Sequence, residues 1–317
     1  MILRTLAFVL SLAAASSAAA QDRLKVAIGQ IDAWANQIPT LGMQAGIFQK
    51  HGIELENFGT QGAGETLQAV ISGSADIGIG IGTSGAMRAF VRGAPIRVIA
   101  AAYAGTGDQY WYVKPDSPLK SLADATDKHT MSYSTNGATS HAIALAFGKQ
   151  LGVKAKPIAT GGPPATYTMT MSGQVDIGWG VMPFGLKEYQ EGKFRIIARG
   201  SDVPSMRNQT MRVQVVNLNA LKERRDVMLR FMRAYRETLD WMYANPQAVK
   251  FYAEKMKMSE DLIVLQRDQF NPKDAMLPDR LSDLDLVMED AVALKFLDKP
   301  MTKEELTELF QIPPAGS

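Results

Sequence analysis

The 317-residue chain lacks cysteine, which excludes disulfides, thiol catalysis, cysteine-bound metals and a lipid anchor on cysteine. It has only three histidines, and neither His51 nor His129 has the spacing to another histidine or carboxylate that a metal site needs. The formal net charge is only +2, so bulk electrostatics do not indicate a nucleic-acid or membrane partner. We therefore expect no metal, no cofactor and no nucleic acid.

Long hydrophobic runs are also scarce. The apolar run near the N-terminus is shorter than the roughly 20 residues that a membrane span needs. Arg4 precedes this run, and a small-residue A-x-A pattern ends at Ala20. These features predict a signal peptide over residues 1–20, cleaved before Gln21, with an uncleaved anchor as the alternative. Secretion without cysteine suits the bacterial periplasm.

Two stretches of nine residues repeat across the chain. SGSADIGIG begins at Ser72, SGQVDIGWG begins at Ser172, and six of the nine columns match. Each stretch predicts a helix that ends at a glycine, followed by a buried strand that begins near Asp76 or Asp176. The repeat therefore predicts one helix-to-strand corner used twice, once in each of two α/β lobes.

Predicted strands alternate with predicted helices over about the first two thirds of the chain. The first strands are expected at residues 23–30, 53–59, 75–82 and 96–105, with helices at 40–52, 62–73 and 83–93 between them. From Leu221 the chain is mostly helical, and an apolar stripe on the helix 225–246 predicts packing against a core. This alternation indicates parallel sheets and an α/β fold.

The order of the motifs resembles a known family. A secretion signal, GIFQKHGIELE, SGSADIG, NGATSHAIALAFGKQLGV, SGQVDIG and AVALKFLDKPMTKEEL follow one another. This order resembles the periplasmic substrate-binding proteins of ABC importers of the nitrate, taurine and alkanesulfonate type. The same superfamily contains binders of thiamine precursors. The resemblance covers nearly the whole mature chain and is specific for the family, not for the ligand.

The resemblance implies a class II periplasmic binding protein fold, in which two crossing strands join two α/β lobes. Lobe 1 would contain residues 22–109 and 213–317, and lobe 2 would contain residues 110–212. The implied function is that of a monomeric solute-binding protein, without catalysis. It would capture a small ligand and deliver it to the membrane permease of an ABC transporter.

Ligands of open α/β sheets bind beyond the carboxyl ends of the strands, where helix N-termini favour anions. Four strand-to-helix turns qualify, at residues 29–37, 60–65, 82–86 and 134–141. We expect Thr83 and Ser84 to face the turn 136–140 across a cleft, with Trp34 as an apolar wall. The full set of predicted ligand-binding residues is Trp34, Asn36, Gly62, Thr83, Ser84, Tyr103, Asn136, Gly137, Thr139, Ser140, His141 and Trp179.

The ligand stays open at this point among sulfonates, carboxylates, heteroaromatic molecules and nitrate. Neutral donors and nearby aromatic residues favour a small organic ligand with a sulfonate-like or carboxylate-like group, and a neutral heteroaromatic molecule such as a thiamine precursor is the alternative. A G-x-G-x-x-G pattern from Gly80 to Gly85 leaves a NAD-type dehydrogenase as a more distant one. That motif needs an acidic residue about 20 positions later, and Asp108 falls beyond the predicted strand end.

Overall fold

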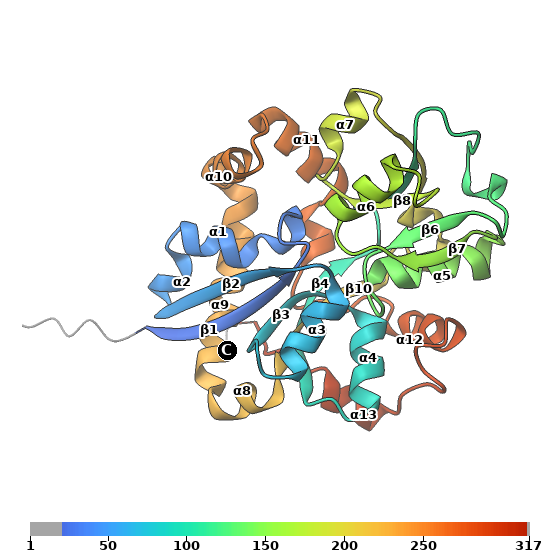
Figure 1. Ribbon diagram of the computed structural model, residues 1–317. Coiled ribbons are helices and arrows are strands. Elements are labelled where there is room, and N and C mark those ends of the chain that lie inside the picture. Colours follow the sequence, from blue (N-terminus) through green and yellow to red (C-terminus); the bar gives the residue numbers. More distant parts are fainter. Residues whose placement is uncertain (1–20, 316–317) are drawn as a thin grey trace, which may run out of the picture.

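The computed structural model describes residues 21–315, so the predicted signal peptide lies outside the described residues. Two α/β lobes lie side by side, each built around its own strands (Figure 1). Among residues 21–315, no helix has both the length and the apolar character to cross a membrane.

The sheet of lobe 1 has five strands in the order β2-β1-β3-β10-β4. β1 pairs in parallel with β2 and β3, whereas β10 runs antiparallel to both of its neighbours. The strands are β1 (Asp22–Gly29), β2 (Ile53–Thr60), β3 (Ile77–Gly82), β4 (Ile96–Ala104) and β10 (Thr210–Asn217).

Lobe 2 repeats this arrangement. β5 lies between β8 and β9 and is antiparallel to both, while β6 pairs in parallel with β7. The Ser132 amide donates to the Ile177 carbonyl at 2.9 Å, which brings β6 beside the chain that enters β8. The strands are β5 (Gln109–Val113), β6 (Thr130–Tyr133), β7 (Lys156–Ala159), β8 (Gly178–Val181) and β9 (Arg195–Arg199).

The order β7-β6-β8-β5-β9 thus matches that of lobe 1, with β5 in the place of β10. In each lobe the antiparallel strand is the one that the chain enters from the other lobe. The chain crosses once between β4 and β5 and again between β9 and β10, as the predicted fold class requires. The lobe boundaries at residues 109 and 213 stay a proposal.

Helices cover both faces of the lobe 1 sheet. Helices α1, α2 and α9 pack together on one face, and α3, α4, α12 and α13 lie on the other (Figure 1). The helices are α1 (Ile38–Gln44), α2 (Ile47–Lys50), α3 (Ala63–Ile71), α4 (Thr83–Val91), α5 (Thr139–Leu151), α6 (Pro163–Met171), α7 (Leu186–Gln190), α8 (Leu218–Glu223), α9 (Arg225–Ala244), α10 (Pro246–Met256), α11 (Glu260–Phe270), α12 (Leu284–Ala293) and α13 (Lys303–Leu309). The single helix predicted over residues 40–52 is wrong, because Gly46 adopts a φ of 75° and separates α1 from α2.

The side chains of β1 show why this sheet is buried on both faces. Leu24, Val26 and Ile28 pack into the cluster under α9, whereas Ala27 points into the cluster under α3 and α4. The predicted apolar stripe of α9 is confirmed, because all of its residues are buried. They are Val227, Met228, Phe231, Met232, Tyr235, Leu239 and Met242.

The repeated stretches form equivalent corners, as predicted. Gly73 and Gly173 end α3 and α6 with φ angles of 76° and 78°. The Asp76 carboxylate then accepts the Lys25 amide of β1 at 2.8 Å, and the Asp176 carboxylate accepts the Thr130 amide of β6 at 2.8 Å. Each aspartate therefore joins the strand that follows its helix to a neighbouring strand of its own lobe, β1 for Asp76 and β6 for Asp176.

Replacing Asp76 or Asp176 by Ala should lower the free energy of unfolding by about 1–2 kcal/mol, because a charge-assisted bond to a strand amide is lost. Urea unfolding of each variant measures the change. Asp127→Ala is the matched control, since Asp127 is exposed and makes no side-chain bond among those described. A loss of ligand affinity per folded molecule, without a change in stability, would contradict a purely structural role.

Candidate functional site

Two neighbouring cavities lie between the lobes and share Gln30, Ala33 and Val181 in their walls. The inner cavity has a volume of about 10 Å³, and the outer cavity has about 210 Å³. Polar residues of the inner wall include Gln30, Asn36, Gln109, Ser134, Thr139, Ser140 and Arg212. Apolar residues of the outer wall include Ile31, Pro163, Pro164, Val181, Pro183, Phe184 and Met256.

Helix N-termini from both lobes reach these cavities. Ala63 and Thr139, the first residues of α3 and α5, line the inner cavity, and Pro163, the first residue of α6, lines the outer one. The positive dipole end of each helix favours an electron-rich group, although α6 begins with Pro163 and Pro164, which have no N–H to donate. The cavities therefore combine a polar inner end with an apolar outer part.

Arg212 is a buried cation in the wall of the inner cavity. Its Nη2 atom donates to the Asp108 carboxylate at 2.6 Å, and its guanidinium lies 4.2 Å from the centre of the Tyr103 ring. Its Nε atom is buried and has no hydrogen-bond acceptor within residues 21–315. Arg212 thus has one donor free for a ligand, although Asp108 balances its charge.

The two lobes touch beside the inner cavity, and glycines make the close approach possible. A Cβ atom on Gly82 would come within 2.7 Å of the Gly137 carbonyl oxygen, and one on Gly85 would come closer still. The Gly64 amide donates to Thr135 Oγ1 at 2.9 Å, which joins α3 of lobe 1 to the loop before α5 of lobe 2. The structure therefore shows the lobes in contact.

Four of the predicted ligand-binding residues line the inner cavity: Asn36, Thr139, Ser140 and Trp179. Most of them are held by contacts of their own. The Asn36 amide donates to the Gly29 carbonyl at 2.5 Å, Ser140 Oγ accepts the Ser134 amide at 3.0 Å, and Trp179 Nε1 donates to Gln109 at 3.0 Å. These contacts orient the side chains that face the cavity.

Thr83 and Ser84 lie opposite Gly137 and Thr139, around a space of about 10 Å³. The Thr83 hydroxyl donates to the Thr210 carbonyl at 2.6 Å, and the Thr139 hydroxyl donates to the Met211 carbonyl at 3.1 Å. The two turns therefore face each other, but they enclose almost no volume and hold the second crossing strand between them.

Trp34 and Tyr103 do not line either of the two cavities described above. Trp34 is fully buried in the core of lobe 1, where its Nε1 atom donates to Tyr243 at 3.1 Å and its ring meets Tyr252 edge-on. The expectation that Trp34 forms an apolar wall beside Thr83 needs correction, because α9 and α10 cover its ring. Tyr103 lines a different cavity, behind Arg212.

The remaining predicted residues shape the lobe contact. Asn136 accepts the Tyr133 hydroxyl at 2.7 Å, and His141 Nδ1 accepts the Gly137 amide at 3.2 Å. Gly62 lies so close to lobe 2 that an added Cβ would come within 2.7 Å of Thr135 Oγ1. These residues hold the 134–137 loop in the conformation that meets lobe 1.

The starts of α3 and α6 share a second repeat, which was not predicted. The Thr66 hydroxyl donates to the Gly62 carbonyl and the Thr166 hydroxyl donates to the Gly162 carbonyl, both at 3.1 Å. Each also bonds to the threonine six residues earlier at 2.6 Å. The signal was present as T-x-G-x-x-x-T from Thr60 and again from residue 160. The repeat fixes the starts of α3 and α6 in the same way.

Arg212 and Gln109 were also missed. Both lie on strands that carry the chain between the lobes, not in strand-to-helix turns. A cation inside the apolar stretch MRVQVVN was the signal that could have found Arg212. Within residues 21–315, no cluster of three or more His, Cys, Asp or Glu side chains could hold a metal ion.

Comparison with known proteins identifies the family. The family model described as NMT1/THI5 like matches residues 40–249, about two thirds of the 317-residue chain. The chain belongs to the NMT1/THI5-like family. No curated protein matches it by sequence.

Solved structures of similar fold include binding proteins and an enzyme. The alkanesulfonate-binding protein SsuA from Xanthomonas axonopodis pv. citri, bound to MOPS, has a TM-score of 0.70 and 16% identity, over 87% of this chain and 92% of that chain. The periplasmic nitrate-binding protein NrtA from Synechocystis PCC 6803 has a TM-score of 0.67 and 12% identity, over 92% and 86%. The desulfurization enzyme DSZB has a TM-score of 0.62 and 16% identity, over 90% and 96%. This NMT1/THI5-like chain therefore has the periplasmic binding protein fold.

The G-x-G-x-x-G pattern has a structural role in this fold. Its second and third glycines, Gly82 and Gly85, lie against the Gly137 carbonyl of lobe 2. The first, Gly80, adopts a φ of 76° and its amide donates to Gln214 at 2.9 Å. The glycines therefore allow the lobes and the second crossing strand to meet, so the pattern needs no dinucleotide to explain it.

Gly85→Ala should hold the lobes apart, because its Cβ would clash with the Gly137 carbonyl. An overpacked contact costs about 1–3 kcal/mol, so the affinity for a ligand enclosed between the lobes should fall about 5–150-fold. Small-angle X-ray scattering should also show a larger radius of gyration. Gly148→Ala is the control, since its Cβ would lie 3.5 Å from the nearest atom, an ordinary contact. Identical scattering and affinity for both variants would argue against a closed state that depends on Gly85.

His141 should make stability depend on pH. Burial, with a smaller contribution from Arg88, lowers the pKa of His141 from 6.5 to about 4. As pH falls below 6.5, His141 becomes protonated in the unfolded chain but stays neutral in the folded chain. The free energy of unfolding should therefore fall until about pH 4. In His141→Gln the loss of unfolding free energy between pH 6.5 and 4 should be smaller by about 1–2 kcal/mol. Urea unfolding between pH 7 and 4 tests it, with His129→Gln as the control, and equal profiles for both variants would contradict it.

Proposed function

We propose that the mature protein is a periplasmic solute-binding protein that captures a small organic ligand between its lobes and delivers it to the membrane permease of an ABC transporter. One observation carries the proposal: three helix N-termini from both lobes and the buried Arg212 meet at one pair of cavities. The NMT1/THI5-like family and the predicted signal peptide support it.

The mechanism is closure of two rigid lobes about the two crossing segments. Each cavity takes part of its wall from lobe 1 and part from lobe 2, so a ligand there contacts both lobes at once. A ligand that binds both lobes stabilises the closed state relative to the open state, and its release to the permease requires opening. No bond in the ligand needs to change.

The lining of the cavities favours a ligand with a polar head and an apolar body. An anionic sulfonate or carboxylate would lie in the outer cavity, next to Gln30 and the start of α6, because the inner cavity of about 10 Å³ has room for about one water molecule. The body would lie against Phe184 and the prolines of the outer cavity. The alkanesulfonate named for the similar SsuA structure is consistent with this class. A neutral heteroaromatic molecule is the alternative, because Phe184 offers a ring face.

Thermal-shift screening tests the function. An alkanesulfonate such as MOPS, a carboxylate of similar size and a neutral aminopyrimidine represent the candidate classes. A ligand that binds the folded state should raise the melting temperature and bind with one-to-one stoichiometry in calorimetry. Chromatography should recover it unchanged after prolonged incubation, whereas turnover that disappears with cavity variants would favour an enzyme like DSZB.

Two matched variants test the position of the ligand. Phe184→Ala removes part of the outer wall and should weaken binding about 5–30-fold, since a buried aromatic contact contributes about 1–2 kcal/mol. Trp34→Ala removes a core ring and should lower stability while leaving the affinity per folded molecule unchanged. If Trp34→Ala weakened binding and Phe184→Ala did not, the ligand would lie beside Trp34.

A further inference from the structure

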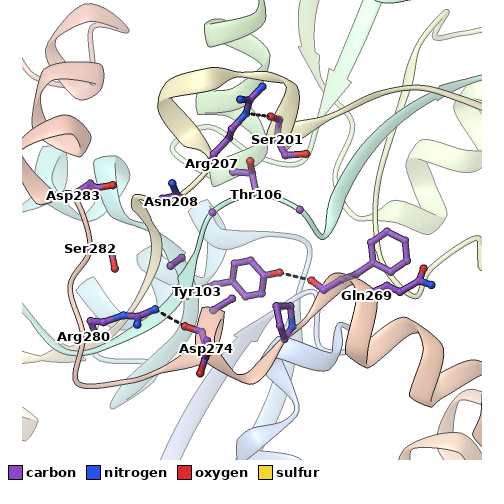
Figure 2. A pocket seen from close by; sticks show the side chains of 16 residues that line it. Tyr103, Thr106, Ser201, Arg207, Asn208, Gln269, Asp274, Arg280, Ser282 and Asp283 are labelled. Carbon is purple, nitrogen blue, oxygen red and sulfur yellow. Dashed lines mark hydrogen bonds between the residues drawn. The ribbon is translucent and has the colours of Figure 1, made fainter.

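A third cavity, the hinge cavity, lies at the two crossing segments and has a volume of about 580 Å³ (Figure 2). Its walls come from residues 103–107 of the first crossing, from Ser201, Arg207 and Asn208 of the second, and from residues 269–283, which comprise the end of α11 and the segment after it. It shares no lining residue with the two cavities between the lobes. Its size is within the range of about 300–1,000 Å³ that is usual for small-molecule sites.

The hinge cavity contains charges of both signs that do not neutralise one another. Arg207, Arg280, Asp274 and Asp283 all line it, and within residues 21–315 none of the four belongs to an ion pair. The lining therefore offers two cations and two anions to an occupant.

Backbone contacts hold both arginines and leave further donors on each guanidinium. Arg207 Nε donates to the Ser201 carbonyl at 2.8 Å, and one Nη atom of Arg280 donates to the Asp274 carbonyl at 2.6 Å (Figure 2). A guanidinium has five N–H donors, so each keeps several for a carboxylate. The arginines are thus oriented before any ligand arrives, which lowers the cost of binding.

An apolar surface accompanies these charges. In Figure 2 the labelled polar side chains surround the ring of Tyr103. The Tyr103 hydroxyl donates to the Phe270 carbonyl, and the Arg212 guanidinium lies over the ring. Phe270 also lines the cavity. The aromatic part is therefore fixed in place, between Arg212 and the end of α11.

We propose that the hinge cavity binds a small zwitterion with an apolar part, of the size of an aromatic amino acid or a dipeptide. Its carboxylate would bind Arg207 or Arg280, its ammonium group would bind Asp274 or Asp283, and its apolar part would lie against Tyr103 and Phe270. A single anion or cation would satisfy only half of the charged groups. The site is separate from the proposed function, since the cavities between the lobes contribute nothing to it.

Calorimetry with defined probes tests the site. L-phenylalanine and the dipeptide Gly-Phe are the zwitterions, phenylpropionate lacks the ammonium group, and phenylethylamine lacks the carboxylate. Both zwitterions should bind saturably, and each analogue should bind at least about tenfold more weakly, since one charge-assisted contact is lost.

Exposed variants locate the bound probe without threatening the fold. Arg280→Gln and Asp283→Asn should each weaken the zwitterions about tenfold, because each removes one charged partner. Asparagine also tolerates the φ of 49° that Asp283 adopts. Arg92→Gln and Asp127→Asn are the controls, exposed charges outside the hinge cavity, and should leave affinity unchanged.

Three outcomes would overturn the proposal. The first is the absence of saturable binding by both zwitterions. The second is unchanged binding in both hinge variants, which would place the probe elsewhere, for example between the lobes. The third is binding of phenylpropionate or phenylethylamine as tight as that of the zwitterions, since the opposite charges would then have no role.

Discussion

The arrangement of the two lobes depends on a buried ion pair between the two segments that connect them. Asp108 follows the first crossing and Arg212 lies on the second, and their side chains meet at 2.6 Å with almost no exposure to solvent. A buried charge without a partner costs several kcal/mol, so either residue strongly requires the other. The pair therefore ties the crossings together at the point about which the lobes would move.

The same pair connects two cavities of the molecule. Arg212 lines the inner cavity between the lobes, while its guanidinium lies over Tyr103, a wall of the hinge cavity. Burial, and the nearby charge of Asp108, raise the pKa of Tyr103 well above its ordinary value, so its hydroxyl stays protonated as the donor to Phe270. A change in the position of Arg212 would thus alter the walls of both cavities.

Glycine backbone forms part of the contact between the lobes. Gly82 and Gly85 of lobe 1 meet the Gly137 carbonyl of lobe 2, and Gly64 donates its amide to Thr135. Without Cβ atoms the helix starts of both lobes can come close enough to share one small ligand. A motif typical of dinucleotide binding therefore arises here from a different requirement, the close approach of two backbones.

Local patterns predicted the fold well and the site unevenly. The glycine corners at Gly73 and Gly173 and the stripe of α9 were predictable, because each follows from a backbone preference or a helical period. Trp34 was misplaced because its neighbours Ala33 and Asn36 do line the inner cavity, while its own side chain turns into the core. The direction of one side chain in a short irregular turn depends on helices more than 200 residues later, such as α10.

The sequence by itself determined the class of the protein: two α/β lobes, repeated corners and strand-to-helix turns rich in small residues. These are local properties, so neighbouring residues contain them. Only the tertiary structure decided that Asp108 pairs with Arg212, that Gly85 meets Gly137, and that charges from two distant segments line the hinge cavity. Such contacts join residues far apart in the chain, and their partners become known only when packing brings the segments together.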